Sequence, residues 1–132
     1  MRTFITLFIF VLLASCKDLS PIKVAPELGE VFELRVGNSV TMANSDITII
    51  FEDVTDDSRC PTSVECVWAG EAKLSIRFNK QNLVFSTYDK LEIEVGSYKI
   101  KLEGLEPYPE HPSQIQKGDY RASFIVTDTS IE

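Results

Sequence analysis

Apolar and polar residues alternate singly along much of the 132-residue chain, and this period limits its fold more than any other feature. The alternation is clear in residues 31–36 and 120–126 and weaker in residues 83–85. Successive side chains of a β-strand point to opposite faces, so such segments form strands with one buried face. No segment after Cys16 has a convincing helical period. The sequence predicts an all-β domain, a single antiparallel β-sandwich of an immunoglobulin-like or related Greek-key type.

One β-hairpin is predicted over residues 91–102, with a two-residue turn at Gly96 and Ser97. Glycine readily adopts the positive φ that such turns require. Pairing about this turn leaves one face apolar. The other face carries two pairs of opposite charge, Glu92 with Lys101 and Glu94 with Lys99.

The N-terminus has the features of a secretory signal peptide, because an apolar run over residues 4–14 follows Arg2. The run is shorter than the roughly 20 residues of a membrane-spanning helix. Residues 13–16 (LASC) resemble the lipobox of bacterial lipoproteins, which implies that Cys16 becomes the first residue of the mature chain and carries the lipid. The alternative is an ordinary signal peptide that is cut elsewhere and leaves Cys16 free.

We therefore expect three segments: a removed signal peptide over residues 1–15, the lipidated Cys16 with a tether up to residue 30, and a β-sandwich over residues 31–132. Cleavage removes Arg2 and leaves 12 of the 13 basic residues against 20 acidic ones, a formal net charge of −8. Such a charge repels nucleic acid, and no basic run offsets it. The expected membrane contact is the lipid on Cys16.

Residues 58–72 (SRCPTSVECVWAGEA) contain two cysteines and the only tryptophan. Lipidation of Cys16 would leave Cys60 and Cys66 as a pair, and an exported pair usually forms a disulfide. Pro61 fixes φ at the start of a tight turn that could bring the two cysteines within disulfide distance.

The parity of the residue numbers, with apolar residues at even positions and polar ones at odd positions over residues 71–79, predicts that a core strand follows this disulfide. Even-numbered residues would share one face of the strand, and a bulge at Gly70 would break the register. The tryptophan would then cap the core beside the disulfide. The even-numbered residues are Cys66, Trp68, Ala72, Leu74, Ile76 and Phe78.

The cysteine segment also allows functional interpretations. A zinc site lacks ligand spacing and a second ligand pair, and a redox site lacks the Cys-X-X-Cys spacing. A constrained recognition loop is the stronger alternative to a purely structural disulfide, because the ring would hold its residues at low entropic cost to binding. Its candidate contact residues are Arg59, Pro61, Val64 and Glu65.

The segment SRCP, followed by CVWAGEA, resembles a motif of small, uncharacterised bacterial secreted proteins and lipoproteins. The resemblance covers about fifteen residues and implies a class of protein without a mechanism. It supports a paired state of Cys60 and Cys66 and a structural role for Trp68.

No catalytic residue, cofactor or metal site is predicted. His111 is the only histidine, so a histidine-based metal site or a serine protease triad has no basis. Four acidic residues could offer oxygen ligands to Ca²⁺, but they lack the spacing of an EF-hand loop and are expected to form a solvated turn. These residues are Glu52, Asp53, Asp56 and Asp57.

We expect a lipid-anchored protein of the bacterial cell envelope, on the outer membrane and facing the periplasm or the surface. Its expected function is that of a non-catalytic binding or structural module for an envelope protein or glycan. The expected contact surfaces are residues 56–66 and 104–117, where prolines predict a rigid crossover between sheets or a contact loop. The alternatives are an inhibitor of secreted proteases that presents the Cys60–Cys66 loop, and an envelope hydrolase that uses acidic residues.

Overall fold

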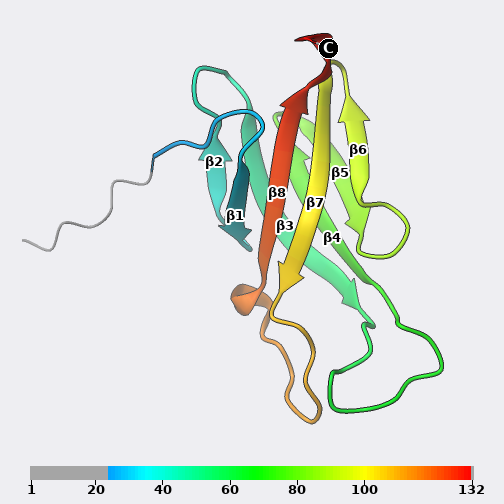
Figure 1. Ribbon diagram of the computed structural model, residues 1–132. Coiled ribbons are helices and arrows are strands. Elements are labelled where there is room, and N and C mark those ends of the chain that lie inside the picture. Colours follow the sequence, from blue (N-terminus) through cyan, green and yellow to red (C-terminus); the bar gives the residue numbers. More distant parts are fainter. Residues whose placement is uncertain (1–23, 132) are drawn as a thin grey trace, which may run out of the picture.

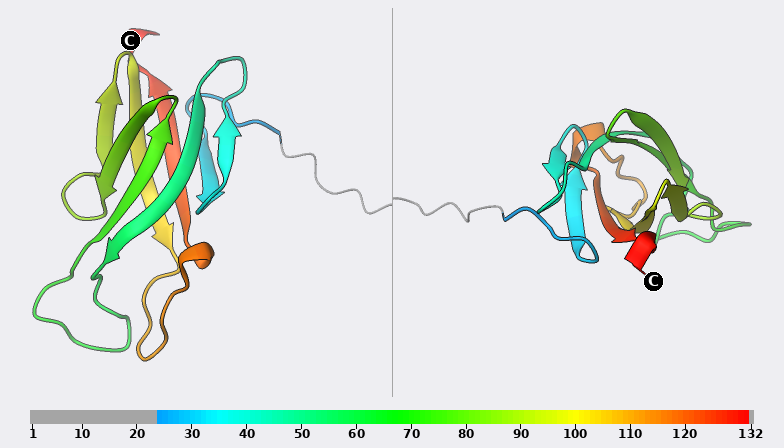
Figure 2. Two further views of the ribbon diagram at one scale, coloured as in Figure 1. Left: turned by 180° about the vertical axis from the view of Figure 1, so that it is seen from behind. Right: turned by 90° about the horizontal axis from the view of Figure 1, so that it is seen from above.

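The computed structural model describes residues 24–131 as two antiparallel four-stranded sheets that face each other (Figures 1 and 2). One sheet has the order β1 (Val31–Arg35), β8 (Arg121–Asp128), β7 (Tyr98–Glu106), β6 (Glu92–Val95). The other has the order β2 (Ser39–Thr41), β3 (Thr48–Asp57), β4 (Ala72–Phe78), β5 (Gln81–Ser86). Two short 3₁₀ turns are present, η1 (Lys117–Asp119) and η2 (Thr129–Ile131). The predicted β-sandwich is confirmed.

The strand order is simpler than that of an immunoglobulin domain. Neighbours within each sheet are consecutive in sequence, except that β1 pairs with β8. The immunoglobulin sheets instead pair strands that are distant in sequence in several places. In the part of the chain that the structure describes, no helix is long and apolar enough to cross a membrane. The predicted signal peptide and Cys16 lie outside the described residues.

The core lies between the sheets and centres on Phe124 of β8. Its ring lies 6.2 Å from Phe51 of β3 and 5.9 Å from Phe85 of β5, so it contacts the opposite sheet at two points. Both contacts are edge-on, an arrangement that aromatic rings prefer. The predicted core residues of β4 are buried, as the alternation of its side chains requires. These are Leu74, Ile76 and Phe78.

The hairpin of β6 and β7 has the predicted register. Glu92 lies opposite Lys101, Glu94 opposite Lys99, and the turn residue Gly96 has φ +60°. Neither of the two expected charge pairs is an ion pair in the structure, and Lys101 instead pairs with Glu103, 2.9 Å away. The turn and the apolar face are therefore sufficient to set this register.

Residues that precede β1 already contact the sandwich. The Ala43 amide donates a hydrogen bond to the Pro26 carbonyl (2.8 Å), and the Gly29 amide donates one to the Val126 carbonyl (2.7 Å). Leu28 packs against the core. The sequence did not predict the contact of residues 26–29 with the sandwich, because this segment lacks the alternation of a strand.

Candidate functional site

Two long loops lie side by side at one end of the sandwich, at the bottom of Figure 1. The cysteine loop, residues 58–71, joins β3 to β4, and the proline loop, residues 107–116, joins β7 to η1 and β8. Since β7 and β8 are neighbours in one sheet, the proline segment is not the crossover between sheets that we expected. The loops nevertheless come from different sheets, so only the tertiary fold brings them together.

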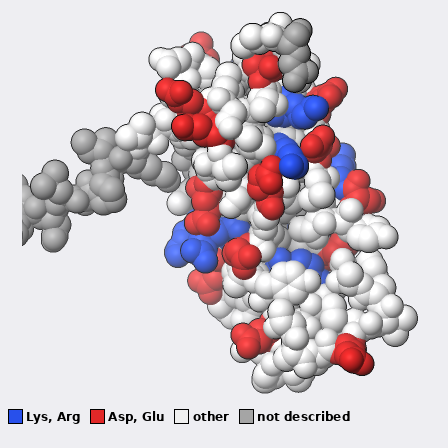
Figure 3. Space-filling model, in the orientation of Figure 1, with Lys and Arg blue, Asp and Glu red and all other residues white. Residues whose placement is uncertain are grey.

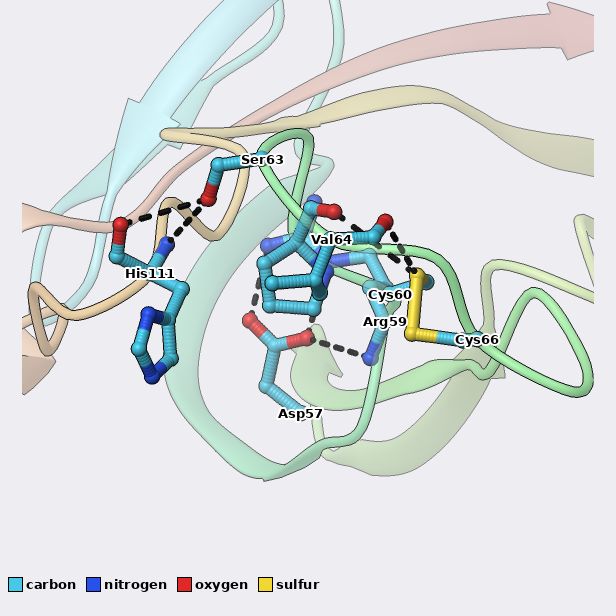
Figure 4. The surroundings of a disulfide bond; sticks show 8 residues. Asp57, Arg59, Cys60, Ser63, Val64, Cys66 and His111 are labelled. Carbon is cyan, nitrogen blue, oxygen red and sulfur yellow. Dashed lines mark hydrogen bonds and ion pairs between the residues drawn. A yellow bond between two sulfur atoms is a disulfide. The ribbon is translucent and has the colours of Figure 1, made fainter.

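Direct hydrogen bonds join the two loops. The Thr62 amide donates to the Pro109 carbonyl (3.1 Å). The Ser63 hydroxyl donates to the His111 carbonyl and accepts from the His111 amide, both at 3.2 Å (Figure 4). The sole histidine therefore contributes its backbone to this contact.

The predicted disulfide between Cys60 and Cys66 is present, with the two Cα atoms 5.9 Å apart (Figure 4). Within the ring, the Val64 amide donates a hydrogen bond to the Pro61 carbonyl (3.3 Å), which closes a turn. Val64 and Glu65 are exposed, and Pro61 is half-buried. Three of the four predicted contact residues are thus accessible on the ring.

The fourth predicted contact residue, Arg59, is buried, with 7% of its surface exposed. Its guanidinium makes two hydrogen bonds to the Asp57 carboxylate, from Nε to Oδ1 (2.8 Å) and from Nη2 to Oδ2 (2.7 Å) (Figure 4). This forked pairing matches the planar geometry of both groups. Arg59 therefore does not offer a free charge to a partner, because its charge is satisfied inside the protein.

Arg59 also connects the cysteine loop to the proline loop. Nη1 donates to the Leu105 carbonyl (2.7 Å) and Nη2 donates to the Pro107 carbonyl (3.0 Å). The guanidinium lies 4.9 Å from the centre of the Tyr108 ring, within the range of a cation–π interaction. One side chain thus holds the end of β3, the end of β7 and the start of the proline loop.

Asp57 completes this network through Tyr120, whose hydroxyl donates to Oδ2 (2.9 Å). Burial by itself raises the pKa of Asp57, but the hydrogen bonds from Arg59 and Tyr120 and the charge of Arg59 outweigh it, so the pKa lies below its usual value. Burial, followed by the contact with Asp57, raises the pKa of Tyr120 to about 12. The carboxylate is therefore ionised and the phenol neutral at physiological pH.

Gly70 is required where the two ends of the cysteine loop meet. It has φ +70°, and a Cβ atom there would overlap the Ser58 carbonyl. Close by, the Cys60 amide donates to the Ala69 carbonyl (2.8 Å) and the Ser58 amide to the Glu71 carbonyl (2.7 Å). Only glycine fits both the positive φ and the close approach.

Trp68 does not lie in the core as predicted, since 56% of its surface is exposed. The parity argument assumed one strand from Cys66 to Phe78, whereas β4 begins at Ala72. Gly70 turns the chain before that point, so the residues that precede it do not share the buried face of β4. The indole instead makes an edge-on contact with Tyr88, with ring centres 6.3 Å apart.

The loop end exposes apolar side chains and few charges. Within residues 60–70 and 107–116, the only Asp, Glu, Lys or Arg residues are Glu65 and Glu110. The face in Figure 3 shows the contrast, with Asp, Glu, Lys and Arg spread over the strands and mostly uncharged atoms at the loop end. We call the exposed apolar and aromatic side chains here the loop surface: Val64, Val67, Trp68, Tyr88 and Tyr108.

An open cleft of about 460 Å³ lies beside Arg59. Its walls come from the cysteine loop, the β5–β6 connection and the last residues of β7. Tyr88 and Tyr108 line it together with Thr87, Glu103 and Glu106. Sequence reasoning did not find the two tyrosines, because residues 88 and 108 lie in different connections and share no motif.

The acidic residues near the cysteine segment do not form a metal site. Glu52 is paired with Arg77, and Asp53 with Lys117 (2.8 Å). Within residues 24–131 there is no group of three or more side chains placed to hold a metal ion.

No protein-family model matches the chain, and no match was found among curated proteins or solved structures. The likeness of the cysteine segment to bacterial lipoproteins stays a prediction.

Replacing Asp57 with Asn should destabilise the protein by about 3 to 5 kcal/mol near neutral pH, because the Arg59 charge is left buried without its partner. The folded-state pKa of Asp57 is depressed, so this stabilisation is complete above the unfolded value and is lost as the pH falls through the folded value. Urea unfolding at several pH values should show the wild type and the variant converging below about pH 4. Asp56→Asn, at an exposed neighbour, is the control, and a pH-independent difference for Asp57→Asn would contradict this account.

Replacing Gly70 with Ala should destabilise the protein by at least about 3 kcal/mol, from the positive φ and the overlap with Ser58 together. Gly37→Ala is the matched control, because Gly37 has φ +85° with open space around its Cα. That change should cost about 1 to 2 kcal/mol. Equal losses in urea unfolding would show that the close approach at Gly70 has no energetic weight.

Proposed function

We propose that the protein is a non-catalytic binding module of the bacterial cell envelope, anchored by lipid on Cys16, and that it binds through the loop surface. The observation that carries the proposal is the exposed Trp68, with its neighbours, on an otherwise acidic protein. Exposed apolar patches of this kind mark interaction sites on soluble domains, and tryptophan and tyrosine dominate binding energies at interfaces.

The rigidity of the loop end supports the same role. The disulfide, the turn inside its ring and the bonds of Arg59 hold both loops before any partner arrives. Little conformational entropy then remains to be lost on binding, which favours affinity. A mobile pair of loops with the same side chains would bind more weakly.

The protease-inhibitor alternative has less support from the geometry. A protease binds the reactive segment of an inhibitor as an extended chain along its active site. Residues 61–64 instead form a closed turn, and Ser63 is bound to His111 on the proline loop. Both features would have to be broken for the Cys60–Cys66 loop to enter such a site.

The anchor can be tested by replacing Cys16 with Ala in the full chain. The lipid supplies about 0.8 kcal/mol of membrane affinity per buried methylene, so its loss should move the protein from the membrane fraction to the soluble fraction after cell lysis. Immunoblots of both fractions would measure this. Ser15→Ala, a change beside the cysteine that keeps the thiol and a small residue before it, is the control for processing. Unchanged membrane retention of an unacylated Cys16→Ala protein would contradict the anchor.

The binding role can be tested with the purified Cys16→Ala protein, mixed with isolated envelope fragments and sedimented. The double change Val67→Ser and Trp68→Ala should weaken co-sedimentation by about 30-fold, the effect of losing about 2 kcal/mol at a binding hot spot. Val31→Ser and Val84→Ser remove exposed valines on β1 and β5 and should leave binding unchanged. Equal losses in the two double variants would contradict a contact at the loop surface.

A further inference from the structure

We propose that the cleft beside Arg59 is a binding site for a short neutral saccharide. The inference rests on the binding role proposed above and names the ligand class of its most enclosed part. The cleft has a volume of about 460 Å³, within the range of sites that hold small ligands. It is open on one side, so a longer glycan chain could enter and leave at its ends.

Two aromatic side chains that line the cleft provide flat platforms for a ligand. Tyr88 is 67% exposed and stands against Trp68, while Tyr108 is exposed and held by the guanidinium of Arg59. Sugar rings have apolar C–H faces that stack on aromatic rings, and hydroxyl groups at their edges. Because both tyrosines are held by neighbours, these platforms exist before a ligand binds.

The polar groups of the cleft are mostly acceptors, which suits a ligand with many hydroxyl donors. Glu103 and Glu106 are among the last residues of β7, and Thr87 lines the cleft from the β5–β6 connection. Glu106 is exposed and has no ion-pair partner within residues 24–131. A sugar hydroxyl can donate to these carboxylates without any change in charge.

The charges of the cleft disfavour other ligand classes. Arg59 is neutralised by Asp57, so it offers no free cation to a phosphate or carboxylate ligand. A lipid chain would cover Glu106 without a partner, which is costly for a charged group. Glu103 is already paired with Lys101, so one unpaired carboxylate remains, which is little charge to hold a polycationic peptide.

The only tryptophan of the chain lies at the rim of this cleft and provides a built-in reporter. The purified Cys16→Ala protein would be titrated with hexasaccharides of glucose, mannose and N-acetylglucosamine while Trp68 fluorescence is recorded. At least one of these probes should produce a saturable change. A sulfated hexasaccharide and hexalysine serve as the anionic and cationic arms and should produce none.

Variants tested by calorimetry then locate the bound probe. Tyr88→Ala and Tyr108→Ala should each weaken binding by about tenfold or more through loss of a stacking surface. Glu106→Gln should weaken it several-fold. Glu94→Gln and Val84→Ala, on β6 and β5 outside the cleft, should have no effect. Urea unfolding of each variant would show that the exposed positions leave the fold intact.

The inference is overturned if none of the neutral hexasaccharides binds, if only the sulfated probe or hexalysine binds, or if binding survives both tyrosine variants. Its failure is distinguishable from failure of the proposed function. Envelope binding that needs Trp68 but is not displaced by any hexasaccharide contradicts the saccharide site alone. Saccharide binding in the cleft, combined with envelope binding that is indifferent to Val67 and Trp68, contradicts the loop surface alone.

Discussion

The loop end of this protein depends on one buried ion pair, that of Arg59 with Asp57. Burying two charges is expensive unless their geometry is good and their remaining hydrogen-bonding groups are satisfied. Both conditions hold here, since the pairing is forked, Arg59 also reaches two backbone carbonyls, and Asp57 also accepts from Tyr120. Asp57 lies at the end of β3 and Arg59 reaches Leu105 on β7, so the pair and its hydrogen bonds link the two sheets at this end of the sandwich.

The sheets and the loops of the molecule differ in what they bury and what they expose. The sheets bury an aromatic core around Phe124 and carry most of the charged side chains on their outer faces. The loops bury little, but the ion pair and the disulfide hold them rigidly. An uncharged aromatic surface on a rigid support is the basis of the binding role proposed above.

Sequence patterns predicted the strands well, because alternation reports directly on which face of a strand is buried. The hairpin of β6 and β7 was predicted to the residue, since a two-residue turn leaves little freedom of register. The same parity argument was wrong for Trp68, because it holds only inside one strand and β4 begins at Ala72, after the turn at Gly70. The ion pair of Arg59 was not predicted, because an arginine beside a disulfide gives no sign of whether the fold provides a buried carboxylate partner.

The sequence by itself determined the all-β class, the hairpin register and the pairing of Cys60 with Cys66, since each follows from residues close together in the chain. The tertiary structure alone decided what lies beside the cysteine loop. Tyr88 and Tyr108 meet at one cleft, and Leu105 and Pro107 meet Arg59, because the ends of distant strands share one end of the sandwich. No local sequence pattern predicts these contacts, because they depend on how the two sheets pack face to face.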